Sequence, residues 1–308
     1  MRRNPGRGSS LFRGFSIGAT WLWLGAFALL PAFGLMLVSL LDKGEIHEFF
    51  IPVLTLENYK ELFAPVFLTV LWDSVSLAAL STLVCLLVGY PFAYRIAKSR
   101  AKWRPWLLLL VIIPFWTNSL IRTYALILII GAQGMVNKAL LALGIISTPL
   151  ELMYTDFAVF VGLTYTFLPF MVLPLYASIE KLDPSLADAA KDLGAGSLRT
   201  FWHITLPLTL PGIVAGCMLV FLPSLGCFYV PEILGGAKNM LLGTFIKNQF
   251  GVANNWPLGA ASSFVLTILL FIMAGLYHLS SLRVAGRERK GLPGASSLQA
   301  VASVGGDE

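Results

Sequence analysis

The sequence predicts an all-α, polytopic membrane protein with six transmembrane helices, and three observations support that fold class. The mean hydropathy of the 308 residues is +0.78, and only 12% of them are charged, whereas a soluble domain carries about twice that share. Apolar stretches of roughly 20–27 residues recur along the chain, each long enough to cross a bilayer core of about 30 Å. Lys and Arg gather in alternate connecting segments, as expected for a chain that crosses the bilayer repeatedly.

The apolar stretches define one transmembrane domain, residues 16–282. A basic segment, 1–15, precedes it, and the long apolar run that follows predicts an uncleaved first span rather than a signal peptide. A tail, 283–308, follows the domain and is expected to be disordered because it is basic and then rich in Gly, Ser and Ala. The expected spans are 16–41, 67–94, 105–131, 156–179, 208–231 and 258–282.

The distribution of basic residues predicts the orientation of the chain. Sixteen Lys and Arg lie in segment 1–15, loop 95–104, loop 181–207 and the tail, against five in the connecting segments of the opposite side. Basic loops stay in the cytoplasm, so both termini and loop 181–207 are expected there. This placement also explains the sequence pI of 9.3 without a nucleic-acid partner.

Prolines are concentrated in three of the spans. Pro114 is expected to interrupt the third span, Pro169 and Pro174 the fourth, and Pro211 and Pro223 the fifth. Broken helices in a membrane usually face protein or a water-filled cavity, because the freed carbonyl groups need partners. These spans are therefore candidates to line a pathway, although prolines also produce simple packing kinks.

Loop 181–207 carries its own helix punctuation. Asp183 suits a helix N-cap, Pro184 suits the first helical position, and Gly194 suits the left-handed residue after the last turn. These residues predict a short helix of roughly ten residues, about 15 Å long. Ser197 is expected to cap a second short helix that runs toward Pro207.

The first of these short helices has an unusual composition. Ala189 and Ala190 make it slim, while Asp188, Lys191 and Asp192 keep it polar. A slim helix with polar flanks suits insertion into a groove on a soluble partner. The alternative is an amphipathic helix that rests on lipid head groups.

The sequence predicts no catalytic, cofactor or metal site. A phosphate-binding loop of the GxxxxGK[ST] type is absent, and no triad or pair of carboxylates stands out. The cysteines are expected to pack as small apolar residues, and the scattered histidines have no ligand spacing. These cysteines and histidines are Cys85, Cys217, Cys227, His47, His203 and His278. Because the chain has no catalytic site in its sequence, energy for any work must come from a partner.

The spacing within loop 181–207 resembles the EAA loop of ABC importer permeases, with Asp188 at the position where that family usually has Glu. The resemblance implies a coupling helix that docks on ABC ATPase subunits, which bind and hydrolyse the ATP. It therefore implies a transport subunit and not an enzyme. The residues that match the motif are Asp188, Ala189, Ala190, Gly194, Ile204, Leu206 and Pro207.

Further segments resemble the permeases of polyamine (spermidine/putrescine) importers, from about residue 69 to residue 282. The resemblance implies a bacterial inner-membrane complex of two different permeases, two ATPase copies and a periplasmic polyamine-binding protein. The matching segments are 114–124 (PFWTNSLIRTY), 168–176 (LPFMVLPLY), 207–213 (PLTLPGI), 228–230 (FYV), 235–239 (GGAKN) and 256–257 (WP).

Glu232 is the candidate for contact with a cationic cargo. It follows Tyr229 at the broken outer end of the fifth span, and an acid beside aromatic rings suits an organic cation. The alternative is an interfacial tyrosine belt with a solvated Glu. Trp116, Asn118 and Tyr165 complete the candidate pathway.

Arg122 lies inside the third span, where a charge is costly. It is expected to pair with an acid such as Asp73 or Asp156. The alternatives are a side chain that extends outward to the membrane surface or one that lines the pathway.

Two other functions fit parts of the sequence. An importer permease for another small solute, a metal or an oxyanion, would keep the same loop, but an anion path would need basic residues inside the bundle, where only Arg122 qualifies. An ATP-independent carrier or channel would have no need for the 188–207 pattern.

Overall fold

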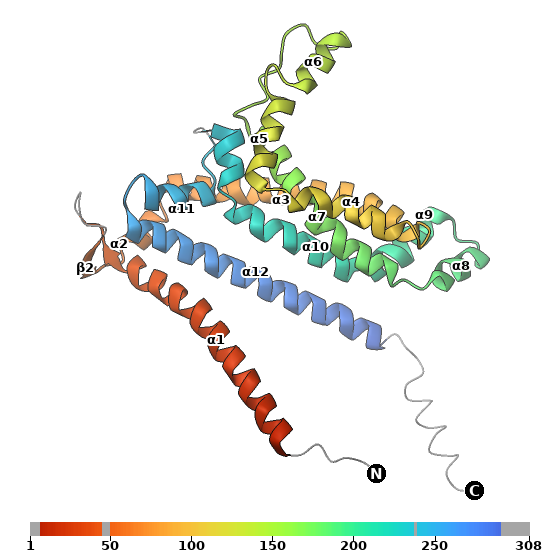
Figure 1. Ribbon diagram of the computed structural model, residues 1–308, viewed down its shortest axis with the longest axis horizontal. Coiled ribbons are helices and arrows are strands. Elements are labelled where there is room, and N and C mark those ends of the chain that lie inside the picture. Colours follow the sequence, from red (N-terminus) through yellow and green to blue (C-terminus); the bar gives the residue numbers. More distant parts are fainter. Residues whose placement is uncertain (1–6, 45–49, 237–238, 291–308) are drawn as a thin grey trace. The chain divides into compact units, whose positions relative to one another are not determined.

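A computed structural model describes residues 7–44, 50–236 and 239–290, with side chains for 15–44, 50–236 and 239–275. The described chain is almost wholly helical (Figure 1), which confirms the predicted all-α class. By length and composition, six helices among the described residues can cross a membrane. They are Phe15–Ser39, Pro65–Lys98, Ser119–Ala142, Asp156–Glu180, Ser197–Gly226 and Trp256–Gly275.

The chain groups into two compact units, residues 1–69 with 245–268 and residues 70–244 with 269–308. In the first unit, Asn58 is buried and links the end of α1 (Arg7–Ser39) to α2 (Glu57–Glu61). Its Nδ2 donates to the carbonyl oxygens of Ser39 (3.0 Å) and Leu41 (2.8 Å). The elements before residue 65 are α1 (Arg7–Ser39), the antiparallel strands β1 (Leu41–Asp42) and β2 (Ile51–Leu54), and α2 (Glu57–Glu61).

The second unit holds α7 (Asp156–Glu180) and α10 (Leu206–Gly226), which pack against each other. Three further helices have residues in both units. The shared helices are α3 (Pro65–Lys98), α11 (Leu242–Gly251) and α12 (Trp256–Lys290). The remaining elements are α4 (Arg104–Trp116), α5 (Ser119–Ile130), α6 (Met135–Ala142), α7 (Asp156–Glu180), α8 (Pro184–Asp192), α9 (Ser197–Thr200), the π-helix η1 (Phe201–Thr205), α10 (Leu206–Gly226) and the π-helix η2 (Pro231–Gly235).

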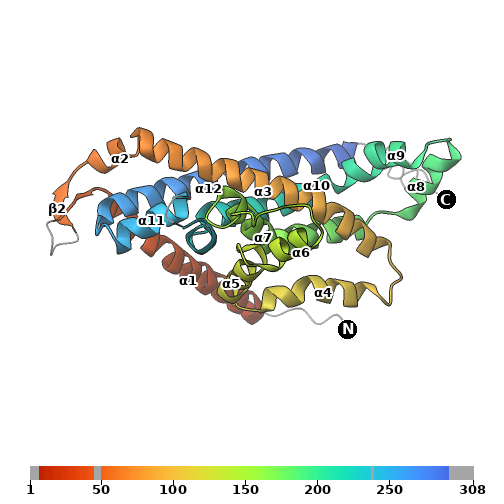
Figure 2. The same cartoon turned by 90° about the horizontal axis from the view of Figure 1, so that it is seen from above.

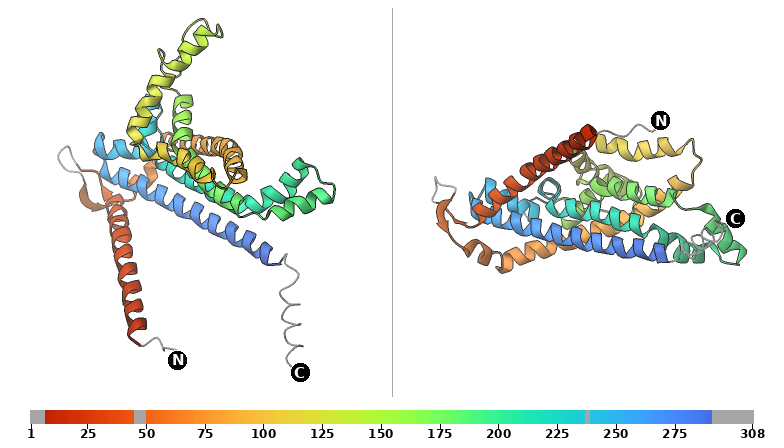
Figure 3. Two further views of the ribbon diagram at one scale, coloured as in Figure 1. Left: turned by 45° about the vertical axis from the view of Figure 1, so that its right-hand side comes forward. Right: turned by 90° about the horizontal axis from the view of Figure 1, so that it is seen from below.

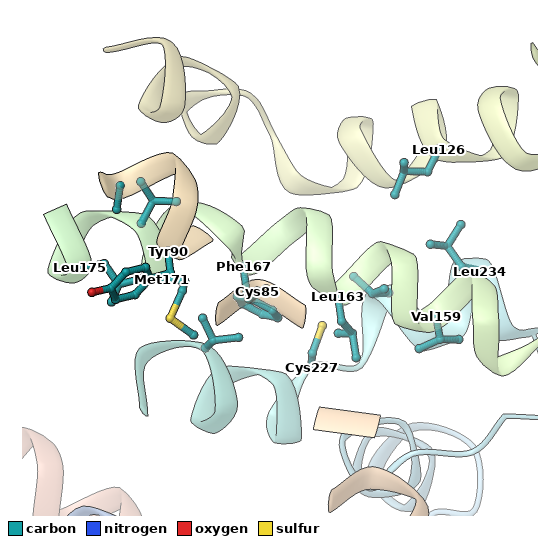
Figure 4. Packing of buried hydrophobic residues seen from close by; sticks show 14 of the residues in the cluster. Cys85, Tyr90, Leu126, Val159, Leu163, Phe167, Met171, Leu175, Cys227 and Leu234 are labelled. Atoms are coloured by element: carbon teal, nitrogen blue, oxygen red, sulfur yellow. The ribbon is translucent and has the colours of Figure 1, made fainter. Parts of the chain in front are cut away.

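Small residues let α7 and α10 pack closely along one another. A Cβ atom at Gly212 would lie 2.4 Å from Cβ of Ser178, and one at Gly216 would lie 2.7 Å from Sδ of Met171. Glycines spaced four residues apart are a common device for close helix packing in membranes. Met171 and Leu175 are fully buried beside this contact (Figure 4), so the glycine face positions the centre of the core.

The third span is broken, as Pro114 predicted, but the break falls three residues later. Helix α4 ends at Trp116, Thr117 is extended, and Asn118 caps α5 by accepting the N–H of Leu120 (2.8 Å). The two helices run in different directions from this break (Figure 1). The span that qualifies by length therefore begins at Ser119 rather than at residue 105.

The predicted interruption of the fourth span is wrong. Helix α7 continues through Pro169 and Pro174 to Glu180. A proline removes one backbone hydrogen bond, and packing against neighbouring helices compensates for that loss in membrane proteins. In the fifth span, α10 continues through Pro211 and Pro223 and breaks only after Gly226, before η2.

The loop after α7 differs from the prediction in its second half. Gly196 rather than Ser197 is the N-cap of α9, and α9, η1 and α10 form one continuous helical run, Ser197–Gly226. A π-helical turn ends at Thr205, two residues before Pro207, which cannot donate the N–H of an ordinary turn. The views agree that α8 and α9 lie together at one end of the α7–α10 pair (Figures 2 and 3).

The chain ends also differ in extent from the expected boundaries. Helix α1 begins at Arg7, within the expected basic segment, and α12 continues to Lys290. The first eight residues of the tail are thus helical, and residues 291–308 lie outside the described residues.

Candidate functional site

Helix α8 has the boundaries that its capping residues predict. Oδ1 of Asp183 accepts the N–H of Ser185 (2.9 Å), and Pro184 opens the helix. At the other end Gly194 has φ +78°, and its N–H donates to the Lys191 carbonyl (2.8 Å) while the N–H of residue 195 donates to the carbonyl of residue 190 (2.9 Å). These two hydrogen bonds form a Schellman motif. Residues within or next to α8 therefore determine both of its ends.

The two alanines of α8 point to different surroundings. Ala190 is buried, whereas Ala189 is exposed. Asp188 and Lys191 form an exposed pair at 2.8 Å beside it. The outer face of α8 is therefore slim at Ala189 and polar at its side, as a helix that enters a groove requires.

Two leucines of the same loop are also exposed, and sequence reasoning missed them. Leu193 is 89% exposed at the C-cap of α8, and Leu198 is exposed on α9. Large apolar side chains at the tip of a polar loop mark an interaction surface. In the sequence, the only sign of this exposed apolar surface was the presence of Leu193 and Leu198 among polar and small residues. We call Asp188, Ala189, Leu193, Gly194 and Leu198 the outer face of the loop.

The charged groups of the loop are stabilised in their ionised forms. The backbone N–H of Ser185 lowers the pKa of Asp183, and the hydrogen bond and charge of Lys191 lower the pKa of Asp188. Asp188 in turn raises the pKa of Lys191. Because both Asp pKa values are lowered, these contributions are present above the ordinary value of 3.8 and are lost as the pH falls through the folded values.

The inner side of the loop faces a cavity of about 160 Å³ at the end of α3 and the end of α7. Ile204 lines this cavity, and Leu206 packs against the hydrophobic core. Pro207 is exposed in the first turn of α10. The motif residues thus divide into an outer set, with Asp188, Ala189 and Gly194, and a set that anchors the loop to the bundle.

The breaks of the third and fifth spans meet near Tyr229. Its hydroxyl lies beside the Ser119 side chain and close enough to Arg122 to interact with that charge. Glu232 follows in the first turn of η2 and is exposed. The structure therefore brings Tyr229 to the start of α5, which Asn118 caps.

The other candidate pathway residues lie apart along their helices. Trp116 is the last residue of α4 and is 74% exposed. Tyr165 is an exposed residue of α7, nine residues or about 14 Å from the start of that helix. Both side chains point away from the buried core, where another subunit, lipid or a pathway can reach them.

The prediction that Arg122 pairs with Asp73 or Asp156 is wrong. Arg122 is only 8% exposed, and no Asp or Glu among the described residues pairs with it. Its guanidinium carbon lies 5.7 Å from the centre of the Phe115 ring. Side chains in a helix point back toward its start, so the break after Trp116 directs Arg122 toward Phe115 and Tyr229 instead of toward an acid.

A second ion pair was missed from the sequence. Arg104, the first residue of α4, lies 3.2 Å from Glu180, the last residue of α7. The only indication of this pair in the sequence was that Arg104 and Glu180 carry opposite charges and were expected at the same side of the membrane. Within the described part of the chain, no cluster of three or more His, Cys, Asp or Glu is placed to hold a metal ion.

Residues 86–286 match the family described as binding-protein-dependent transport system inner membrane component. The chain is 45% identical over 267 residues to the spermidine/putrescine transport system permease protein PotB of Haemophilus influenzae, which covers 87% of this chain and 93% of that protein. It is 50% identical over 259 residues to PotB of Escherichia coli K12, covering 84% and 94% of the two chains.

More distant similarities extend beyond these relatives. The molybdenum transport system permease protein ModB of Mycobacterium bovis is 30% identical over 211 residues, with 68% of this chain and 77% of that protein covered. A chain of a bacterial alginate ABC transporter, solved in complex with an alginate pentasaccharide-bound periplasmic protein, matches with a TM-score of 0.72. That match covers 90% of this chain and 96% of the other at 17% identity, so it shows the fold alone.

Proposed function

The chain belongs to the family of binding-protein-dependent transport system inner membrane components, and we propose that it is the permease subunit of an ATP-driven importer of polyamines. The observation that carries this proposal is the identity of 45–50% to permeases named for spermidine and putrescine, over 84–87% of this chain. The chain is a multi-pass protein of the inner membrane and a transport subunit rather than an enzyme.

The proposed partners follow from the two ends of the bundle. On the cytoplasmic side, the outer face of the loop docks in a groove of an ABC ATPase subunit, which binds and hydrolyses ATP. On the periplasmic side, a polyamine-binding protein delivers the cargo, and a second, different permease completes the bundle. The excess of basic residues on the loop side supports cytoplasmic positions for both termini.

The coupling step follows from the structure of loop 181–207. Helix α8 is held by caps at both ends and faces a cavity on its inner side. It is also joined to α7 by only three residues, 181–183. Closure of the ATPase dimer would displace α8 and with it α7. The bundle would then open alternately to the two sides, as transporters do by rocking their repeats.

The proposed cargo contacts lie where the fifth span breaks. Phe228 and Tyr229 meet edge to face, with ring centroids 6.1 Å apart, and Glu232 follows within one turn. A carboxylate attracts an ammonium group by charge, and aromatic faces add a cation–π contribution of about 0.5–2 kcal/mol. Together they suit the linear amines of a polyamine.

One observation favours a second candidate function, the import of an oxyanion. Arg122 is buried beside Tyr229, and a guanidinium there would attract an anionic cargo. A relative named for molybdenum transport is 30% identical. The much higher identity to the spermidine/putrescine permeases makes the polyamine the proposed cargo.

Competition for uptake distinguishes these two cargoes. Cells that lack other polyamine uptake, and that express this chain with its companion subunits, should accumulate labelled spermidine and putrescine. An excess of unlabelled polyamine should abolish the signal, and molybdate should leave it unchanged. Uptake of labelled molybdate, without uptake of either polyamine, would replace the proposed function by the second candidate.

Replacing Glu232 by Gln should raise the apparent KM for spermidine roughly tenfold, because loss of one charge-assisted contact corresponds to about 1.5 kcal/mol. The maximal rate should change less, since no chemistry depends on this group. Initial uptake rates over a range of spermidine concentrations provide the measurement. Glu151→Gln, at an exposed position on an outer connecting segment, is the matched control, and equal KM values for both variants and the wild type would remove Glu232 from the pathway.

A further inference from the structure

The start of α4 is joined to the end of α7 by an ion pair, and a backbone carbonyl holds the arginine of that pair. Arg104 Nη1 lies 3.2 Å from Oε1 of Glu180, and Nε of Arg104 donates to the Ser99 carbonyl (3.1 Å). Glu180 ends α7, where the helix dipole disfavours a negative charge. Arg104 therefore offsets that charge while the Ser99 carbonyl fixes the direction of its guanidinium group.

A second contact fastens the other end of α4 to the same helix. Phe115 of α4 meets Phe170 of α7 edge to face, with ring centroids 5.0 Å apart. Arg104 and Phe115 are eleven residues apart, about 16 Å along a helix, and Glu180 and Phe170 are ten apart, about 15 Å. The two spacings match, as they must for two antiparallel helices joined at both ends.

A stripe of apolar side chains fills the interval between these two contacts. Leu107, Leu108 and Val111 of α4 pack against the hydrophobic core. With Arg104 and Phe115 they recur at the three- and four-residue intervals of one helical face. Helix α4 thus contacts the core between its two ends as well as at them.

Both ends of the contact between α4 and α7 lie near features of the proposed mechanism. Only residues 181–183 separate α7 from α8, which is too short a connection to absorb a displacement of α8. At the far end, Phe115 stacks against Arg122 of α5 across the break at Thr117 (guanidinium carbon to ring centre, 5.7 Å). Movement of α4 therefore changes the geometry of the break that lies beside Tyr229.

We propose that Arg104 and Glu180 are positioning residues for transport, which bind α4 to α7 so that displacement of α8 reaches the α4–α5 break. This inference rests on the proposed function, because it assigns the source of the displacement to an ATPase. The side chains of Arg104 and Glu180 are 32% and 41% exposed, and ion pairs at such positions contribute little to folding stability. Their function can therefore be separated from folding.

The inference is tested by reversing the charge of Arg104 and of Glu180 separately, and then of both together. The measurements use the complete transporter in proteoliposomes. Arg104→Glu and Glu180→Arg should each reduce spermidine uptake at least tenfold per ATP hydrolysed, while ATP hydrolysis continues. The double variant Arg104→Glu with Glu180→Arg should recover uptake to within about threefold of the wild type, and Arg104→Lys should remain active, because an ammonium group can still pair with the carboxylate. Lys102→Glu, an equal charge change at an exposed position in the same loop, should leave uptake unchanged.

The alternative outcomes are distinct. Single variants that assemble and transport normally would overturn the inference, and so would a double variant as inactive as the single ones. If a charge-reversed chain fails to assemble, the neutral pair Arg104→Gln and Glu180→Gln supplies the comparison, and wild-type coupling in that double variant would also overturn it. Failure of the proposed function would appear separately, as absent spermidine uptake by the wild-type assembly.

Discussion

Replacing Ala189 by Trp is expected to reduce ATP-driven uptake more than tenfold while the chain remains folded and inserted. Ala189 is exposed on the slim outer face of α8, so the indole ring meets no atom of the core. In a groove of the ATPase the same ring would be overpacked, and overpacking costs about 1–3 kcal/mol, or roughly a fivefold to 150-fold loss of affinity. Labelled spermidine uptake and the amount of ATPase that co-purifies with the permease are the two measurements.

The matched control for this variant is Ala101→Trp. Ala101 is also exposed and lies in loop 95–104, so it receives the same added bulk away from the outer face of the loop. Its uptake and its co-purifying ATPase should equal those of the wild type. Wild-type uptake by Ala189→Trp would show that α8 does not enter a groove and would contradict the proposed coupling.

Replacing Gly212 by Leu should prevent the chain from reaching a stable fold. A Cβ atom at this position would lie 2.4 Å from Cβ of Ser178 and 2.9 Å from the Pro174 carbonyl oxygen. Neither atom is the end of a flexible side chain, so α7 and α10 must separate along the contact that centres the core. A cost of 1–3 kcal/mol or more is large against a total stability of about 5–15 kcal/mol. The yield of folded chain in membranes and its thermal aggregation temperature should both fall.

A control variant and a rescue variant test whether a loss of folding in Gly212→Leu comes from the contact between α7 and α10. Gly25→Leu adds the same side chain to α1 at a position where no atom lies within 4 Å, and its yield should remain near that of the wild type. Ser178→Gly should partly restore Gly212→Ala, because it removes the Cβ that the alanine would meet. A normal yield for Gly212→Leu would mean that α7 and α10 do not pack face to face at Gly212.

Local chemistry explains which features could be predicted from the sequence. The ends of α8 depend on Asp183, Pro184 and Gly194, each of which acts through its own backbone or the nearest turn, and the structure has all three in the predicted roles. The six apolar helices follow from composition alone, because a bilayer sets their length. Neither the ends of α8 nor the apolar helices depend on which distant segments of the chain pack against one another.

The errors occurred where packing between distant segments decides the structure. Pro169 and Pro174 are sequence signals for a break, yet α7 remains continuous beside α10. The Arg104–Glu180 pair joins residues 76 positions apart, and nothing in the sequence shows which acid meets which base. Arg122 was expected to find an acid, but the break after Trp116 turns its side chain toward Phe115.

The most direct test of the central claim asks what the outer face of the loop touches in the native membrane. A photo-reactive amino acid in place of Leu193, which is 89% exposed, samples that contact without disturbing the core. Irradiation of membranes that contain the whole transporter should yield a covalent product with the ATPase subunit, and the amount of that product should change when ATP is added. Products with lipid alone, together with an ATPase that remains unlinked in every nucleotide state, would contradict the account.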